Sequence, residues 1–481
     1  MKQRSLKQNF LMNAILTMSN FIFPLITFPY VSRILLPEGM GKVTFAASVI
    51  SYFSMFAQLG IPVYGIRACA KVREDKKKLS QTAHELLIIN IAMSAFCYAS
   101  FGVLLFYVPK FREEKALFLI TSLTILFNTI GMEWLYKALE QYTYITIRSI
   151  VFKFVALAAM FALIHSKTDY VIYGAISIFA SSASNIMNFF NSRKFIFLKS
   201  CGKYDFKQHL PPVLVFFAMS CATTVYTHLD VVMLGFMSTD TDVGYYNAAI
   251  KIKVILVSIV TSLGHVLLPR LSYYIQNNMT EEFRNITDKA VNFIVVLAAP
   301  LTVYFMLFAR EGIFFLSGRE YVGSVLPMQI LMPTLLLIGL SSLMGLQILV
   351  PLGREKTVLY SEVMGAGVDL LINSLTIPRF ASVGAAAGTL TAEAVVWLFQ
   401  FCALKSVVIP SYKKIRYPII LLGLASGSLS AFLIKRLIHN LFFMLMISAT
   451  SFFGVYGTVL LAGKEPIAVE IKKIVLREQK K

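Results

Sequence analysis

Charged residues are scarce in this sequence. They make up 15% of the 481 residues, whereas hydrophobic residues make up 57%. Soluble domains average about 25% charged residues, so the composition excludes a soluble domain with a single anchor. The mean hydropathy of +0.70 agrees. Long polar stretches are lacking too, which argues against an enzyme whose catalytic site lies in a large soluble loop. We therefore expect an integral membrane protein along the whole chain.

Cysteine is also rare. The five cysteines are Cys69, Cys97, Cys201, Cys221 and Cys402, and they show no Cys-x-x-Cys pair and no metal-ligand spacing. We interpret them as small core residues and expect no metal site. The sequence also lacks a nucleotide-binding loop, so direct ATP hydrolysis is not expected. These absences together predict no cofactor and no covalent chemistry.

Acidic residues are outnumbered, with 25 Asp and Glu against 45 Lys and Arg, giving a net charge of +20. Such an excess can indicate nucleic-acid binding, but the positive-inside rule explains it more simply. Lysine and arginine are roughly three times as frequent on one set of alternate loops as on the other. We therefore predict a multi-pass protein of the cytoplasmic membrane with both termini in the cytoplasm, and no nucleic-acid partner.

Long apolar runs without alternation of polar residues fill the chain, so the spans are predicted to be helices rather than barrel strands. At about 20 residues per span plus short loops, the length allows roughly fourteen helices. The predicted spans are 10–36, 43–68, 83–108, 116–136, 149–165, 170–191, 211–236, 243–267, 287–309, 323–350, 357–377, 383–404, 417–434 and 440–462. The first run is too long for a signal peptide.

The longest basic connection, residues 193–209, separates two groups of six spans. We predict an N-terminal six-helix lobe over 1–200, a C-terminal six-helix lobe over 201–410, and two further helices with a basic tail over 411–481. The segment after Gly41 resembles the segment after Gly244, and six spans separate them. An even offset predicts a parallel repeat, with two lobes around a central cavity.

Charged side chains interrupt the apolar runs around the second glycine. Asp230 lies near the end of one run, and Lys251 and Lys253 lie in the next. A charge at the bilayer centre costs about 2.5–3.5 kcal/mol, so such residues usually face a protein interior or a water-filled cavity. Two interpretations remain open: an ion pair that holds two helices together, or the lining of a transport path. Two positions apart on a helix, the lysines point about 200° away from each other.

Several segments together resemble the multidrug/oligosaccharidyl-lipid/polysaccharide exporter superfamily and, within it, polysaccharide-unit flippases of the Wzx (O-antigen or capsule translocase) type. The matching segments are 28–35, 59–67, 131–142 with 147–148, 230–251 and 378–393. The resemblance implies fourteen helices in two six-helix bundles plus two more. It also implies translocation of an undecaprenyl-pyrophosphate-linked oligosaccharide to the outer leaflet, for O-antigen, capsule or exopolysaccharide synthesis. A drug/cation antiporter of the same superfamily is the alternative.

The pyrophosphate of such a substrate requires cations, and arginine suits phosphate well. Our candidates are Arg33, Arg67 and Lys251. Arg67 has a second interpretation as a positive-inside anchor, and Arg33 with Asp230 is a candidate gate or ion pair near the outer mouth of the cavity.

Two acidic residues fall near the middle of predicted spans, Asp369 and Glu393. A buried carboxylate can exchange a proton, so we predict that one of them couples ion movement, of protons or sodium, to export. The alternative is a buried, hydrogen-bonded group with no such role. Besides the lipid-linked glycan, the expected partners are membrane lipid, the coupling ion and, as a further candidate, the polysaccharide polymerase.

Overall fold

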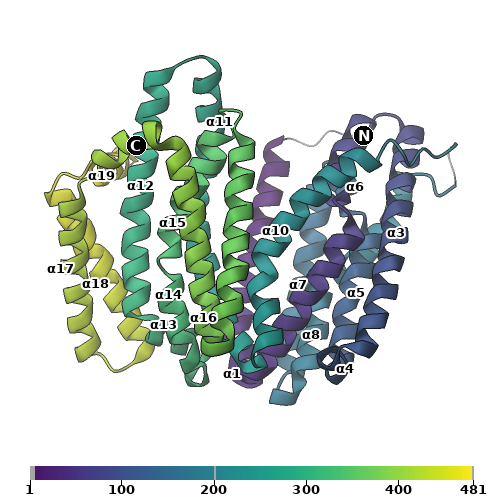
Figure 1. Ribbon diagram of the computed structural model, residues 1–481, viewed down its shortest axis with the longest axis horizontal. Helices are drawn as coiled ribbons and strands as arrows, with labels where there is room; N and C mark the ends of the chain where they lie inside the picture. Colours follow the sequence, from purple (N-terminus) through teal and green to yellow (C-terminus); the bar gives the residue numbers. More distant parts are fainter. Residues whose placement is uncertain (1–5, 200–201, 479–481) are drawn as a thin grey trace. The chain divides into compact units, whose positions relative to one another are not determined.

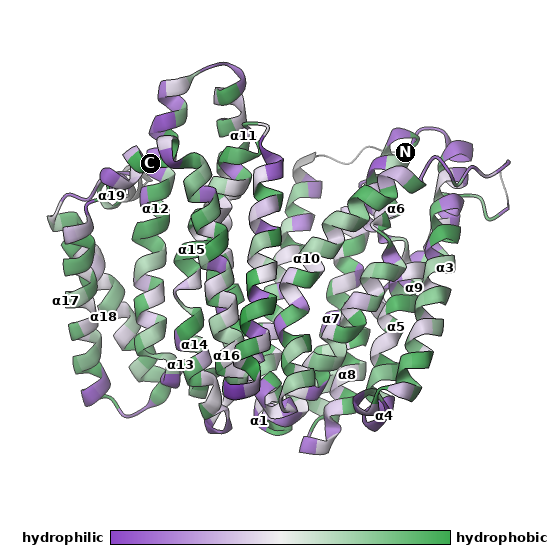
Figure 2. Cartoon of the chain, in the orientation of Figure 1, coloured by the Kyte–Doolittle hydropathy of each residue, from purple (hydrophilic) through white to green (hydrophobic). Residues whose placement is uncertain are grey.

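The computed structural model describes residues 6–199 and 202–478, and among these every regular element is a helix (Figure 1). Apolar residues run along the helices, and polar residues gather toward their ends and the loops (Figure 2). Large apolar side chains such as Leu375 and Leu421 lie exposed, at 60% and 63%. Because an exposed leucine is stable in lipid and a helix satisfies its own backbone groups there, the predicted all-α membrane protein is confirmed.

The chain divides into two compact units, Met1–Gly244 and Tyr245–Lys481. Helix α10 is thereby grouped with the first unit, whereas the predicted lobe boundary places it at the start of the second lobe. The lobes were predicted from the order of the membrane spans, whereas the two compact units are defined by contacts within the fold. The predicted boundaries at residues 200 and 410 therefore stay predictions.

The first unit is built around α1, which packs against α3, α5, α7 and α10. Helix α1 is broken at Leu36, where φ is 61°, and Pro37 follows directly, so the helix consists of two arms. The first arm corresponds to the predicted span 10–36, whereas the predicted span 43–68 covers most of the second arm together with most of α2. The helices of this unit are α1 (Leu6–Gln58), α2 (Ile61–Lys71), α3 (Lys76–Tyr107), α4 (Pro109–Glu113), α5 (Lys115–Gly131), α6 (Glu133–Ala138), α7 (Tyr142–Leu163), α8 (Tyr170–Ile178), α9 (Asn185–Asn191) and α10 (Leu210–Met237). Short helical turns η1 (Lys167–Asp169), η2 (Phe179–Ala183) and η3 (Ser192–Lys194) complete it.

The second unit contains another broken helix, α16, which is interrupted at Ala381 with a φ of 48°. A hairpin of α17 and α18 packs against α12. The helices are α11 (Asp240–Gln276), which begins in the first unit, α12 (Thr280–Leu307), α13 (Ala309–Ser317), α14 (Val325–Leu331), α15 (Thr334–Ser342), α16 (Glu355–Lys413), α17 (Tyr417–Leu437), α18 (Leu441–Ala462) and α19 (Pro466–Glu478).

Within the described residues, ten helices are long and apolar enough to cross a membrane, or eleven if the pair bent by 45° at residues 331–334 is one span. Two of these, α1 and α16, contain a break, and α5 is an additional shorter apolar helix. The exact number of fourteen spans stays a prediction.

Two details of the predicted local structure are wrong. The helix that contains the predicted span 149–165 is α7, and it begins earlier, at Tyr142. Among the cysteines, Cys69 and Cys97 are buried, but Cys402 is exposed rather than a core residue. Cys201 lies outside the described residues.

The break in α1 packs tightly on the turn between α10 and α11. A Cβ atom on Gly41 would overlap the backbone carbonyl of Asp240, and one on Gly244 would overlap the carbonyl of Pro37. Beside this contact, the Lys110 ammonium forms an ion pair with Asp240 at 2.9 Å and donates to the Gly235 carbonyl. The two glycines that the sequence comparison paired therefore meet, because neither has a side chain to separate the turns.

Candidate functional site

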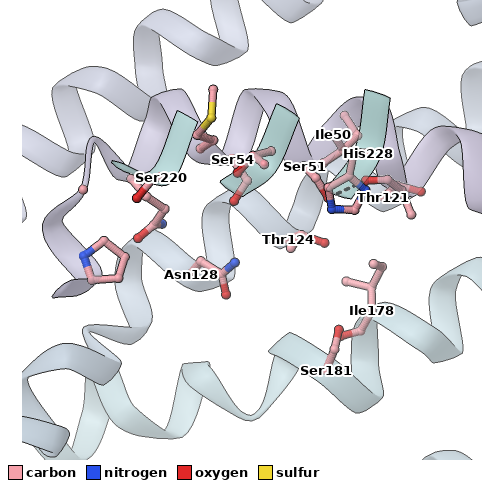
Figure 3. A pocket seen from close by; sticks show the side chains of 16 residues that line it. Ile50, Ser51, Ser54, Thr121, Thr124, Asn128, Ile178, Ser181, Ser220 and His228 are labelled. Atoms are coloured by element: carbon pink, nitrogen blue, oxygen red, sulfur yellow. Dashed lines mark hydrogen bonds between the residues drawn. The ribbon is translucent and has the colours of Figure 1, made fainter. Parts of the chain in front are cut away.

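A cavity of about 450 Å³ lies inside the first unit, bordered by α1, the start of α2, α5, α8, η2 and α10 (Figure 3). Its volume is within the range of small-molecule pockets in proteins. In Figure 3, Thr124 and Asn128 point toward an open space that Ile178 and Ser181 border from the other side. The cavity therefore lies among the helices of the first unit.

Polar side chains reach this cavity as three stripes, one on each of three helices. The members of a stripe are three or four residues apart, which is the spacing that brings side chains to one face of a helix. The stripes are Ser51, Ser54 and Gln58 on α1; Thr121, Thr124 and Asn128 on α5; and Ser220, Thr224 and His228 on α10. Our sequence analysis assigned none of the nine residues to a site, although this spacing is a signal that could have identified them.

Two polar groups of the cavity lack partners. Among the described residues, neither Gln58 Nε2 nor Thr124 Oγ1 has a hydrogen-bond partner, although both atoms are buried. Other lining groups are bonded: Asn185 Nδ2 donates to Asn128 Oδ1 over 3.1 Å, and His228 Nδ1 lies 3.2 Å from Ser48 Oγ. Buried polar groups are normally satisfied, so these two atoms, which the surrounding protein covers, are exceptions among the described residues.

The cavity is almost free of charge. Of its sixteen lining residues, none is Asp, Glu, Lys or Arg, and His228 is the only one with an ionisable side chain. None is Phe, Tyr or Trp either. The lining therefore offers hydroxyl and amide groups that donate and accept hydrogen bonds, rather than ion pairing or ring stacking.

The predicted cationic residues lie elsewhere. Arg33 is exposed near the end of the first arm of α1, where its Nη1 donates to the Pro29 carbonyl, and Arg67 is exposed on α2. Neither lines the cavity of the first unit. Asp230 is buried in α10, two residues beyond the lining residue His228. The proposed contact between Arg33 and Asp230 stays a prediction.

In the second unit the predicted acids are buried on α16. Asp369 is 6% exposed and Glu393 is 2% exposed. Asn373 Nδ2 donates to Asp369 Oδ1 over 3.1 Å, and a Cβ atom on Gly388 would lie 2.9 Å from the same oxygen. Asp369 therefore faces the other arm of α16, on which Glu393 lies, so the break at Ala381 folds the two arms together.

The two lysines of α11 differ in their surroundings. Lys251 is exposed, whereas Lys253 is 9% exposed. Both facts fit a separation of about 200° around the helix.

One buried lysine was missed. Lys153 lies near the middle of α7 and is 9% exposed. Its Nζ lies 2.7 Å from Ser19 Oγ and also contacts Asn20 Oδ1 on α1. No Asp or Glu occurs in residues 8–32 of α1 or in the segment 170–183 that also packs on α7. Its described hydrogen-bond acceptors are thus neutral oxygens in a region without acids.

A second missed cluster connects the loop before α10 to α3. Glu85, 1% exposed, accepts from the backbone N–H of Asp205 over 2.8 Å and lies 2.7 Å from Nε2 of His209. The other ring nitrogen of His209 lies 2.8 Å from the hydroxyl of Tyr64 on α2. In the sequence, the signal for this cluster was Glu85 itself, a single acidic residue at the start of a long apolar run. The cluster fastens the start of α10 to α2 and α3.

Comparisons with known proteins agree with this architecture. The family described as polysaccharide biosynthesis protein matches residues 6–275. Two proteins named "Putative O-antigen transporter" are similar: that of Escherichia coli strain K12 is 24% identical over 396 residues, covering 82% of this chain and 95% of that protein. That of Shigella dysenteriae is 25% identical over 411 residues, covering 83% and 100%.

Two solved structures are similar in fold. The lipid II flippase MurJ in its inward closed conformation aligns with a TM-score of 0.71 at 17% identity, covering 95% of this chain and 100% of that one. An inward-facing multidrug resistance MATE family transporter of the MOP superfamily aligns with a TM-score of 0.61 at 13% identity, covering 83% and 98%. At these identities the structures show the fold alone. The predicted resemblance is confirmed, and so is the expectation that the chain is not an enzyme.

Proposed function

Because the chain belongs to the polysaccharide biosynthesis protein family, we propose that it moves undecaprenyl-pyrophosphate-linked oligosaccharide units across the cytoplasmic membrane for surface polysaccharide synthesis. O-antigen, capsule and exopolysaccharide are the candidate products. The observation that supports this most is the cavity of hydroxyl and amide groups inside a bundle that exposes many large apolar side chains. A glycan must exchange water for protein hydrogen bonds when it enters a membrane, and such a lining supplies them.

The proposed mechanism is alternating access between the two six-helix lobes, with both termini in the cytoplasm. In it, Arg33, Arg67 and Lys251 bind the pyrophosphate in turn. The exposure of Arg33 and Arg67 supports this role, because a group that binds a large substrate must be reachable. The neutral cavity and the cations would then act on different parts of one substrate.

Ion coupling by Asp369 or Glu393 is also part of the proposal. Both carboxyl groups are buried in a membrane helix, where the charged form of a carboxyl group is costly. Binding a proton or sodium ion would neutralise the charge, so the energy of the ion gradient could be used there. Membrane lipid and the polysaccharide polymerase remain proposed partners.

The alternative, a drug/cation antiporter, requires an acidic cavity to attract cations. The cavity of the first unit contains no acid among its sixteen lining residues, which favours the glycan substrate.

The test is complementation of a strain that lacks its sugar-unit flippase, with surface polysaccharide as the measurement. Wild type should restore the polymer, Arg33→Ala should not, and Arg112→Ala, an exposed arginine of α4, should behave as wild type at equal protein level. If wild type fails in several hosts with different polysaccharides and instead raises resistance to cationic drugs, the antiporter replaces the flippase.

A further inference from the structure

The polar groups of the first unit's cavity suit a sugar. Hydroxyls of Ser54 and Thr124 can both donate and accept, and the amides of Gln58 and Asn128 offer a donor and an acceptor each. Sugar hydroxyls have the same dual character, so a sugar ring in the cavity can exchange hydrogen bonds with these lining side chains. The cavity is therefore suited to read a glycan by hydrogen bonds.

The same lining is unsuited to an ionised sugar. A carboxylate taken from water into an apolar bundle loses its hydration and is best compensated by a cation, whereas an uncharged sugar needs only neutral hydrogen-bond partners. The sixteen lining residues include no lysine or arginine, and the one ionisable side chain, His228, lies 3.2 Å from Ser48 Oγ. A sugar with an ammonium group would find no carboxylate either. An uncharged sugar meets neither problem.

We propose that this cavity binds the sugar portion of the lipid-linked substrate and selects an uncharged unit over one that contains a uronic acid or a similar acidic sugar. The inference rests on the proposed function and adds the chemical class of the glycan. The two parts of the substrate would then have different binding residues. The cavity binds the neutral sugar, and Arg33, Arg67 and Lys251 bind the pyrophosphate.

The test uses the full chain in liposomes and two synthetic probes. Both are undecaprenyl-pyrophosphate trisaccharides with a dithionite-sensitive fluorophore on the glycan, one with only neutral hexoses and one with a single hexose oxidised to a uronic acid. Translocation is followed as the fluorophore becomes protected from external dithionite. We expect the neutral probe to move at least tenfold faster.

Variants connect this preference to the cavity. Thr124→Val keeps the side-chain shape and removes a hydroxyl of the lining, and Gln58→Leu removes an amide of the lining. Each should slow the neutral probe about 2–10-fold, as expected for one lost hydrogen bond. Gln58→Lys adds a cation to the cavity and should reduce the difference in translocation rate between the neutral and the acidic probe. Ser426→Ala on α17, whose hydroxyl bonds to its own helix at Leu422, is the control. Unfolding temperatures show that each variant is folded.

The outcomes separate the two proposals. Equal rates for both probes, or folded Thr124→Val and Gln58→Leu proteins with wild-type rates, would overturn the inference while leaving the flippase intact. No movement of either probe beyond protein-free liposomes would overturn the proposed function and this inference with it. The assignment is supported if the neutral probe moves faster than the acidic probe in wild type and if both Thr124→Val and Gln58→Leu reduce this difference in rate.

Discussion

Replacement of Gly41 by alanine tests the tightest contact in the first unit. The new Cβ atom would lie 2.7 Å from the carbonyl carbon of Asp240 and 3.0 Å from the amide nitrogen of Gly244. Both neighbours are backbone, so neither can rotate away. The arm of α1 and the α10–α11 turn must therefore separate.

The expected loss of stability follows from two opposing terms. Overpacking of a tight contact costs about 1–3 kcal/mol, and alanine recovers about 0.5–1 kcal/mol because glycine is unfavourable in a helix. The new Cβ atom would also overlap the Asp240 carbonyl oxygen, so the cost lies at the upper end, about 3 kcal/mol, and the net loss is about 2–2.5 kcal/mol. A domain of 150–250 residues loses roughly 2–4 °C per kcal/mol, so the unfolding temperature should fall by about 4–10 °C.

The measurement is thermal unfolding in detergent, followed with a dye that reacts with the buried thiols of Cys69 and Cys97 as they become exposed. The matched control is Gly102→Ala in α3, where an added Cβ atom has no neighbour within 4 Å, so its unfolding temperature should stay the same or rise. Equal unfolding temperatures for Gly41→Ala and Gly102→Ala would refute the close approach. In the double variant, the loss of stability should be smaller than the sum of the losses in Gly41→Ala and Gly244→Ala, because both substitutions disrupt the same contact.

Three further predictions concern buried charges. Glu85→Leu should lower the unfolding temperature, by the equivalent of about 1–3 kcal/mol for each buried donor left without an acceptor, because the Asp205 amide and His209 both lose the Glu85 carboxylate; an unchanged temperature would contradict a stabilising role of these contacts. Lys153→Met should be as stable as wild type or more stable, since it removes a buried charge whose described acceptors are neutral; a lower temperature would contradict this. Asp369→Asn or Glu393→Gln should abolish stimulation of transport by an ion gradient, and full stimulation in both would exclude the coupling proposal.

Local properties were predictable from the sequence. Composition and the length of apolar runs determine that the chain is helical in the membrane, because only helices and closed barrels satisfy the backbone there. Asp369 and Glu393 were identifiable as deeply buried acids for the same reason: few acids interrupt long apolar runs. The family motifs, each short and local, were also visible.

The neutral cavity depended on tertiary structure. A serine or threonine in a membrane helix can satisfy its hydroxyl on its own backbone, as Ser220 does with the Phe216 carbonyl and Thr121 with that of Leu117. Its presence in an apolar run therefore does not reveal whether it faces lipid, a neighbour or a cavity. Only the packing of α1 against α5 and α10 places three such stripes around one space. Charge is costly anywhere in lipid and so is visible in a sequence, whereas neutral polar groups acquire a function only from what the fold places opposite them.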